Sequence, residues 1–93
     1  MTREEREIYN RALYEFGISK QVIMVCEECA ELINVLTKTF RARLTRDDVI
    51  TELADVSIMV EQLAFFFGED LFVAEKNRKL KRLKERLNNP TEE

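Results

Sequence analysis

The sequence contains few residues that break helices: two glycines and one proline among 93 residues. Because glycine and proline interrupt regular secondary structure, their scarcity predicts long helices joined by short connections. No segment alternates apolar and polar residues cleanly enough to predict a β-strand. With 45% hydrophobic and 35% charged residues, the composition is typical of a compact, helix-rich soluble protein rather than a disordered one. The sequence therefore predicts an all-α fold.

The chain has no histidine and only two cysteines, Cys26 and Cys29. Two cysteines without histidine cannot complete a tetrahedral zinc site within one chain, and di-iron carboxylate bundles use Glu-x-x-His motifs. So few cysteines also argue against a disulfide framework and indicate a reducing cytoplasm. Both cysteines share a helix side with Leu32, Ile33 and Leu36, so we expect them to be buried in the core.

Long apolar runs are absent as well. No apolar stretch of the kind found in secretory signals follows Met1, and no run approaches the length of a membrane span. We therefore expect a cytoplasmic protein with no membrane segment. A chain of 93 residues is too short for two independent cores, so residues 1–93 are expected to form one domain. Because such a core is small, self-association is expected.

Capping signals divide the chain into four predicted helices. The expected helices begin and end near residues 2–17, 19–40, 45–68 and 69–88. Residues 41–44 are the expected connector between the second and third helices, and residues 90–93 are an expected frayed tail. The residues that give these bounds are Thr2 with Glu5 and Thr45 with Asp48 as capping boxes, Ser19 as a cap with the staple Ile18 and Ile23, and the closing glycines Gly17 and Gly68.

Two pairs of acids lie within strongly apolar helical patterns: Glu28 with Glu31, and Glu52 with Asp55. Residues three apart share a helix face. The neighbours on these two faces are Met24, Val35, Met59, Gln62 and Phe66. Burying unpaired carboxylates is costly, and at ~5 Å and an effective dielectric of ~20 each pair repels by about 3 kcal/mol. A divalent cation is the simplest compensation.

The short connector predicts that the second and third helices are antiparallel neighbours, so the four carboxylates are expected to converge. A ligand set made only of oxygen favours Mg²⁺, with Mn²⁺ as an alternative. Such an ion polarises a phosphoryl oxygen, activates a water and holds a polyphosphate, which indicates chemistry on phosphates. Acids three apart on a helix are also common on solvated surfaces, so an ordinary charged face is the alternative interpretation.

The net charge of −3 is unevenly distributed. Seven of the 15 bases, but only one of the 18 acids, lie within residues 76–86 of the last predicted helix. This basic run offers cationic donors for a triphosphate, or it is a solvated face around a leucine stripe. The rest of the chain is acidic, whereas a protein that binds duplex nucleic acid is more often basic overall.

The acid motifs resemble those of the MazG-like family of all-α nucleoside triphosphate pyrophosphohydrolases. The match is E-E-C-A-E at residues 27–31 and E-L-A-D at residues 52–55, within a resemblance over roughly residues 18–87. It implies Mg²⁺-dependent hydrolysis of a nucleoside triphosphate to the monophosphate and pyrophosphate. By motif position, it implies that Glu28, Glu31, Glu52 and Asp55 are the metal ligands.

The resemblance also implies roles outside the metal site. Glu27 matches a leading acid that orients the attacking water or holds a further metal, and Lys79 and Arg82 match basic residues that meet phosphates. Members of the family assemble as homodimers or homotetramers whose helices pack into bundles. Two alternatives stay open: a phosphoribosyl-ATP pyrophosphatase, which differs in substrate, and a helical assembly module that keeps the acids but has no catalytic activity.

Overall fold

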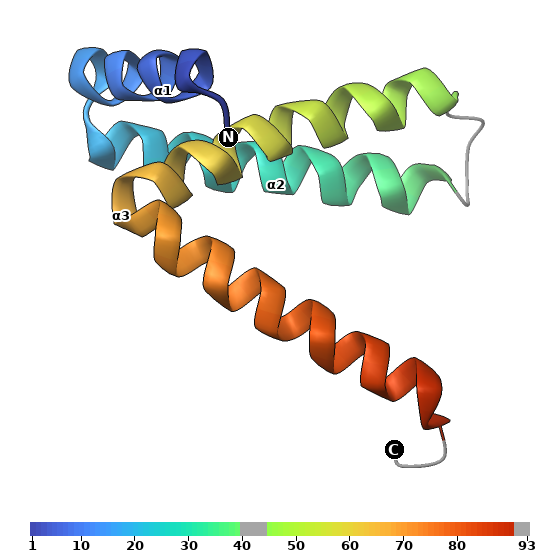
Figure 1. The fold of residues 1–93 in the computed structure, drawn as a ribbon. Helices are drawn as coiled ribbons and strands as arrows, with labels where there is room; N and C mark the ends of the chain where they lie inside the picture. Colours follow the sequence, from blue (N-terminus) through green and yellow to red (C-terminus); the bar gives the residue numbers. More distant parts are fainter. Residues whose placement is uncertain (40–44, 91–93) are drawn as a thin grey trace.

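The computed structural model describes residues 1–39 and 45–90, and these residues form an all-α fold, as predicted. The described helices are α1 (Arg3–Phe16), α2 (Ile18–Thr39) and α3 (Arg46–Asn88) (Figure 1). The prediction of four helices is wrong, because the third and fourth expected helices belong to one helical element. The expected connector at residues 41–44 and the tail residues 91–93 lie outside the described residues.

Gly68 bends α3 instead of ending it. Its φ of 141° and ψ of 95° are not helical, yet the helix resumes at the next residue (Figure 1). Glycine has no Cβ, so it adopts such a φ where other residues would be strained, and the helix changes direction without a loop. A glycine that closes a helix and one that bends it look alike in a sequence, and this is why the predicted helix end was wrong.

The predicted capping boxes are confirmed at both helix N-termini where they were expected. The Thr2 hydroxyl accepts a hydrogen bond from the Glu5 N–H at 3.0 Å, and the Glu5 carboxylate accepts one from the Thr2 N–H at 2.6 Å. Thr45 and Asp48 form the same reciprocal pair at the start of α3. Gly17 follows α1 with a φ of 84°, as expected of a closing glycine.

The predicted cap at Ser19 is wrong. Helix α2 already begins at Ile18, and the Gly17 carbonyl accepts a hydrogen bond from the Gln21 N–H at 3.2 Å. Ser19 therefore lies inside the first turn of α2 and not before it. Gly17 ends one helix and leads directly into the next, which leaves no room for a separate capping residue.

Helix α2 and the first half of α3 lie side by side and antiparallel, and α1 packs against one end of this pair (Figure 1). Among the described residues, those that are buried are Tyr9, Gln21, Gln62 and Ala64. Two of these four are amides, so a single chain has only a small apolar core. Residues 70–90 are exposed throughout.

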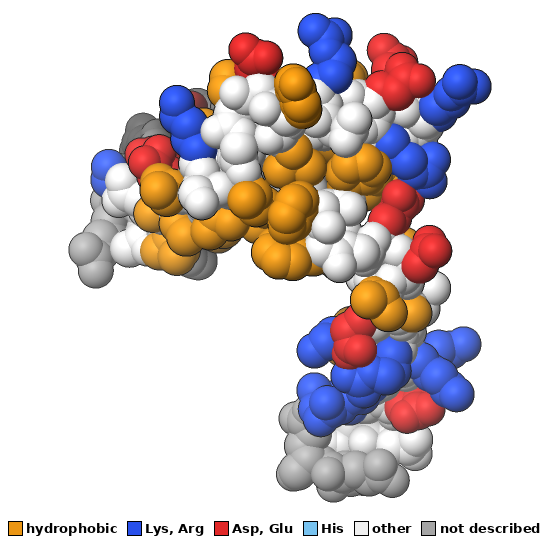
Figure 2. Space-filling model, turned by 90° about the vertical axis from the view of Figure 1, so that its left-hand side faces the viewer, with side chains coloured by type: hydrophobic (Ala, Val, Ile, Leu, Met, Phe, Trp, Pro, Cys, Tyr) orange, Lys and Arg blue, Asp and Glu red, His pale blue; other side chains and the backbone are white. Residues whose placement is uncertain are grey.

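The second half of α3, residues 69–88, projects away from the helix pair, and we call it the arm (Figure 1). Figure 2 shows Lys and Arg side chains crowded on this projecting part, while apolar side chains form a broad patch on the remainder of the molecule. The structure thus separates the basic run from the acidic body in space as well as in sequence. None of the described helices is both long enough and apolar enough to cross a membrane.

Candidate metal centre

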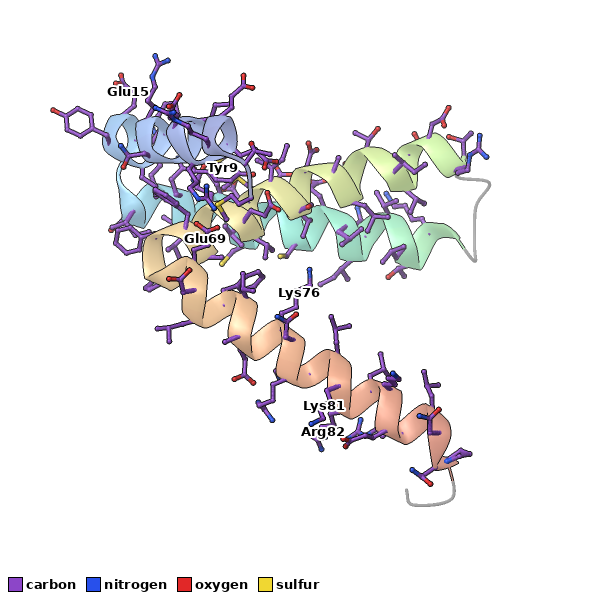
Figure 3. The ribbon with its side chains drawn as sticks, in the orientation of Figure 1. Tyr9, Glu15, Glu69, Lys76, Lys81 and Arg82 are labelled. Carbon is purple, nitrogen blue, oxygen red and sulfur yellow. The ribbon has the colours of Figure 1, made fainter. Side chains whose placement is uncertain are left out.

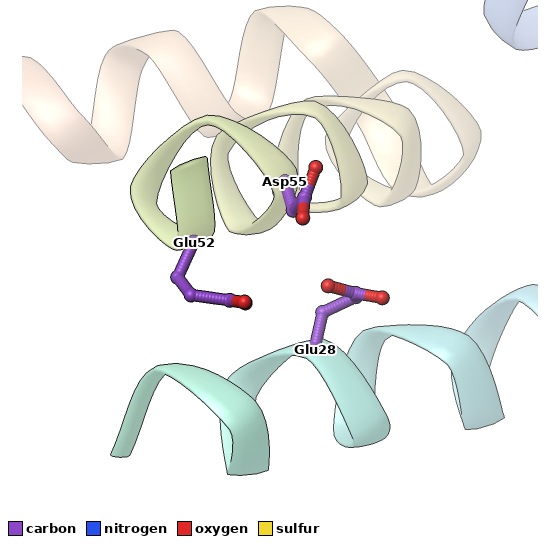
Figure 4. A group of neighbouring side chains, drawn as sticks. All are labelled: Glu28, Glu52 and Asp55. Atoms are coloured by element: carbon purple, nitrogen blue, oxygen red, sulfur yellow. The ribbon is translucent and has the colours of Figure 1, made fainter. Parts of the chain in front are cut away.

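Three carboxylates from the two acid motifs meet between α2 and α3 (Figure 4). Glu28 projects from α2, and Glu52 and Asp55 project from α3 toward it. One carboxylate oxygen from each residue lies within 4.8 Å of the others. We call Glu28, Glu52 and Asp55 the acidic cluster. Its geometry follows from two facts: residues three apart share a helix face, and the two helices run antiparallel with these faces opposed.

Glu52 carries the feature that distinguishes the cluster from an ordinary charged surface. Its Oε2 atom is buried and has no hydrogen-bond partner among the described residues. Burial raises the pKa of the Glu52 carboxyl, and the negative charges of Asp55, Glu28 and Glu31 raise it further. Among the described residues, the charges that shift this pKa are all negative. A buried carboxylate oxygen with no donor and no countercharge is costly, so this position favours a cation.

The donor set fits a small, hard divalent ion. Ligand oxygens lie about 2.1 Å from Mg²⁺, so two oxygens that bind one ion lie at most about 4.2 Å apart. The cluster's oxygens meet within 4.8 Å, so the side chains would have to move closer together to hold such an ion. Oxygen ligands alone suit Mg²⁺ or Mn²⁺ better than zinc or copper. Three protein carboxylates would leave coordination positions of such an ion free for water and for other oxygen ligands.

Glu31 and Glu27 lie outside the acidic cluster. Glu31 is exposed, and its oxygens are not among those that meet within 4.8 Å. Its charge nevertheless acts on Glu52, so it stands at the edge of the cluster. Glu27, the expected water-orienting acid, is also exposed. The structure therefore brings together three of the four predicted metal ligands, with the fourth nearby.

The predicted phosphate-binding residues, Lys79 and Arg82, both lie on the arm, where Arg82 projects outward (Figure 3). Lys79 lines an open apolar cavity of about 360 Å³ together with Leu80 and Leu83. Neither base is among the charges that act on Glu52. Because the arm diverges from the α2–α3 pair, a single chain does not bring these bases and the acidic cluster together (Figure 1).

The two cysteines are not buried in the core, so that prediction is wrong. Cys26 is exposed and Cys29 is partly exposed. They share a side of α2 with Ile33 and Leu36, which are 65% and 42% exposed. This side of α2 is thus largely exposed in one chain, and an apolar stripe in the sequence does not show whether a partner covers it.

Sequence reasoning missed a buried polar pair in the same interface between α2 and α3, about two helical turns from the acidic cluster. The Gln62 Nε2 atom donates a hydrogen bond of 2.6 Å to the Gln21 Oε1 atom, between α3 and α2. Gln62 interrupts an apolar face that continues through Met59 and Phe66, and this was a detectable signal. Gln21 had no such signal, because a contact between helices depends on how they are aligned.

In comparisons of sequence and of structure, the chain matches no protein-family model, no curated protein and no solved structure. The resemblance to the MazG-like family is therefore carried only by the acid motifs at residues 27–31 and 52–55, and the function inferred from it is a proposal.

Proposed function

We propose that this chain is a Mg²⁺-dependent nucleoside triphosphate pyrophosphohydrolase that releases a nucleoside monophosphate and pyrophosphate. The observation that carries the proposal is the buried Oε2 atom of Glu52, which has no hydrogen-bond partner within residues 1–39 and 45–90 and lies near the negative charges of Asp55, Glu28 and Glu31. A divalent cation relieves this arrangement, and a hard cation held by a few carboxylates is typical of sites that bind phosphates. The resemblance of the acid motifs to the MazG-like family supplies the reaction class.

Each acid has a proposed role. Glu28, Glu52 and Asp55 hold the ion, with Mn²⁺ as a substitute for Mg²⁺, and Glu31 approaches as a fourth ligand from the edge of the cluster. The bound ion stabilises negative charge on the phosphoryl oxygens. Glu27 is exposed on the same helix as Glu28, where it can orient the attacking water. Lys79 and Arg82 meet the phosphates of the substrate.

We further propose that the protein acts as a homodimer or homotetramer. Leu71 and Leu87 are 73% and 71% exposed, and the bend at Gly68 borders an apolar cavity of about 600 Å³. Exposed apolar surface of this extent marks an interface. The basic arm and the acidic body are complementary in charge, so a second copy that covers the apolar surfaces can bring Lys79 and Arg82 to its neighbour's acidic cluster.

The reaction is tested by measuring pyrophosphate release from a panel of NTPs, dNTPs and phosphoribosyl-ATP, with and without Mg²⁺. Isotopically labelled water should place the label in the monophosphate, and release of orthophosphate with a diphosphate would contradict the proposal. Asp55→Asn should lower turnover by orders of magnitude, because it weakens the binding of the charge-stabilising ion. Asp47→Asn is the matched control, since Asp47 is an exposed acid on α3 outside the cluster.

The same assay separates the two alternatives. Turnover of phosphoribosyl-ATP in preference to ordinary triphosphates would identify a phosphoribosyl-ATP pyrophosphatase. A protein that assembles but turns over none of these substrates with Mg²⁺ or Mn²⁺ would be a non-catalytic assembly module. Exposed apolar side chains on α3 support assembly in each case, so light scattering alone does not distinguish the three functions.

Assembly itself is tested by light scattering of the wild type and of Leu83→Glu. Leu83 is 50% exposed on the apolar stripe of the arm, and a carboxylate there should lower the oligomeric mass. Lys84→Glu is the control, because it places a carboxylate at an exposed neighbouring position. It lowers the net charge by two units, against one unit for Leu83→Glu, so an effect of charge alone should be at least as large in the control. A wild type that is monomeric at all concentrations would rule out the proposed assembly.

A further inference from the structure

The buried amides Gln21 and Gln62 hold a fixed place relative to the acidic cluster. Gln21 lies on α2 seven residues before Glu28, and Gln62 lies on α3 seven residues after Asp55. Seven residues are about two helical turns. Because the helices are antiparallel, the alignment that places Gln21 against Gln62 also places Glu28 against Asp55, two turns further along the same interface.

By the same register, Glu31 is aligned with Glu52. The negative charge of Glu31 is among the causes that raise the pKa of Glu52, which agrees with this alignment. The hydrogen bond between Gln62 and Gln21 is 2.6 Å long, and the two residues are 4% and 6% exposed. The hydrogen bond between Gln62 and Gln21 and the contacts of the acidic cluster thus correspond to the same register of α2 against α3.

The cluster itself cannot set this register. Its carboxylates repel one another, and one buried oxygen of Glu52 has no hydrogen-bond donor among the described residues. Without an ion, these interactions therefore disfavour the alignment of α2 and α3 that brings the carboxylates together. Apolar contacts are not directional, and they tolerate a slip of one helix along the other. A slip by one turn moves a residue by about 5.4 Å, which exceeds the 4.8 Å within which the cluster's oxygens meet.

The amide pair penalises such a slip. Separating Gln21 from Gln62 leaves two amides without partners in a buried interface, and an unpaired buried polar group is costly. A single buried polar residue is known to select register in helix pairs by this mechanism, at some cost in stability.

We propose that Gln21 and Gln62 are positioning residues that set the register of α2 against α3 and so assemble the metal centre. The register part stands on the geometry alone, whereas the effect on metal binding rests on the proposed function. Replacing both amides by leucine removes the directional contact and leaves the interface apolar, so the pair Gln21→Leu/Gln62→Leu is expected to retain or increase stability. Its affinity for Mn²⁺ is expected to fall at least about tenfold, which corresponds to about 1.4 kcal/mol.

The matched control is Met24→Leu/Met59→Leu. These methionines lie between the amides and the acids on the same two helices, so the control changes apolar packing closer to the cluster without touching the hydrogen bond. It should bind Mn²⁺ like the wild type. Calorimetry gives the affinity for Mn²⁺, and urea unfolding without metal gives the stability, so a fall in affinity with no loss of stability separates positioning from general support of the fold.

Register is measured independently of metal from the distance between spin labels on Asn34→Cys and Asp47→Cys. Both positions are exposed, and Cys26 and Cys29 are replaced by alanine in every protein. The wild type should give one narrow distance, and the leucine pair should add a population displaced by about one turn, or 5.4 Å. Labelled chains are diluted with unlabelled chains so that only distances within one chain are seen.

The proposal is overturned if the double variant Gln21→Leu/Gln62→Leu keeps the single distance between the two spin labels, or if it binds Mn²⁺ as tightly as the wild type does. If no variant, including the wild type, binds Mn²⁺ or Mg²⁺, the proposed function fails while the label distances still decide the register claim. The two failures are therefore distinguishable.

Discussion

The hydroxyl of Tyr9 donates a hydrogen bond of 2.5 Å to Oε1 of Glu61, which joins α1 to α3 seven residues before the bend at Gly68. On the other side of the bend, Arg6 pairs with Glu69 through two hydrogen bonds of 2.8 and 2.9 Å. Helix α1 therefore contacts α3 on both sides of Gly68, and it contributes to fixing the direction in which the arm leaves the body.

Tyr9→Phe should lower the free energy of unfolding by about 2 kcal/mol, because it removes a hydrogen bond to a charged acceptor. Tyr9 is 4% exposed, so its ring stays packed in the variant. The control is Tyr14→Phe, since Tyr14 is 91% exposed and should leave stability unchanged. Urea unfolding of both variants measures the difference, and an equal effect of the two would contradict a role for the Tyr9 hydroxyl.

The Tyr9 contact also predicts a pH dependence in alkali. Burial, and then the hydrogen bond to Glu61, raise the pKa of the Tyr9 hydroxyl above its ordinary value of 10.0. The stability from this group is therefore present below pH 10 and is lost as the pH rises above it. Wild type and Tyr9→Phe should converge in stability at high pH.

The pairing of Arg6 with Glu69 predicts the opposite pH dependence in acid. The hydrogen bond from Arg6 holds the pKa of the Glu69 carboxyl below its ordinary value of 4.5. A lowered folded-state pKa stabilises the fold above pH 4.5, and this contribution is lost as the pH falls. The difference in melting temperature between the wild type and Arg6→Ala should thus be present at pH 7 and shrink in acid. Arg3→Ala is the control, because Arg3 pairs with Glu7 within α1 and is 93% exposed.

Glu52 should respond to pH and metal together. The pKa of the Glu52 carboxyl is raised, mainly by burial and then by the charge of Asp55. Its contribution to the stability of the fold is therefore fully present below the ordinary pKa of 4.5, and it is lost as the pH rises through the folded-state pKa. Without metal, Glu52→Gln should therefore be more stable than the wild type at neutral pH.

With Mg²⁺ this order should reverse. A ligand present at 100 times its dissociation constant stabilises the folded state by about 2.7 kcal/mol. The wild type should gain this stability and Glu52→Gln should not, whereas the exposed Glu15→Gln should behave like the wild type. Thermal unfolding with and without Mg²⁺ checks the prediction, and a wild type that does not respond to Mg²⁺ or Mn²⁺ would count against the metal centre.

Gly68→Ala should be costly, because a residue with a Cβ is strained at a φ of 141° by about 1–3 kcal/mol. The added Cβ would also lie 3.2 Å from Cδ1 of Leu71, which is closer than an ordinary contact. Gly17→Ala is the comparison: its φ of 84° is strained too, but no atom lies within 4 Å of the added Cβ. Urea unfolding should therefore show a larger loss for Gly68→Ala, and equal losses would mean that the contact with Leu71 carries no cost.

What the sequence predicted correctly was local. The capping boxes at Thr2 and Thr45 depend on residues three apart, and the structure contains both. The predicted all-α class followed from the scarcity of helix breakers. The acid faces of α2 and α3 followed from helical spacing, although only the structure shows that Glu28 meets Glu52 and Asp55 while Glu31 stays at the edge.

What the sequence did not predict depends on segments far apart in the chain. Gly68 bends a helix where α1 contacts α3 on both sides of it, and these contacts join residues more than 50 positions apart. The partner of Gln62 depends on the register of α2, and the exposure of Cys26 depends on whether another surface covers that side of α2. Such contacts leave no periodic pattern within one helix.

Assemblies that contain two different variant chains should show whether the arm of one copy binds substrate at the acidic cluster of another. Asp55→Asn disables the cluster, and Arg82→Ala disables the arm, where a guanidinium grips phosphate through two hydrogen bonds and lysine acts as a point charge. Each variant alone should release pyrophosphate slowly. If the arm acts between copies, an assembly of both chains pairs an intact cluster with an intact arm, and activity should rise well above that of either variant.

If the arm instead acted within its own chain, every site in the mixture would be defective and no activity would return. Two different affinity tags, purified in sequence, ensure that only mixed assemblies are assayed. Lys84→Ala is the control for the arm, because Lys84 is an exposed base further along it and its loss should leave turnover unchanged. If Arg82→Ala and Lys79→Ala are both as active as the wild type, the basic run is a solvated face around Leu80 and Leu83 and does not contact substrate.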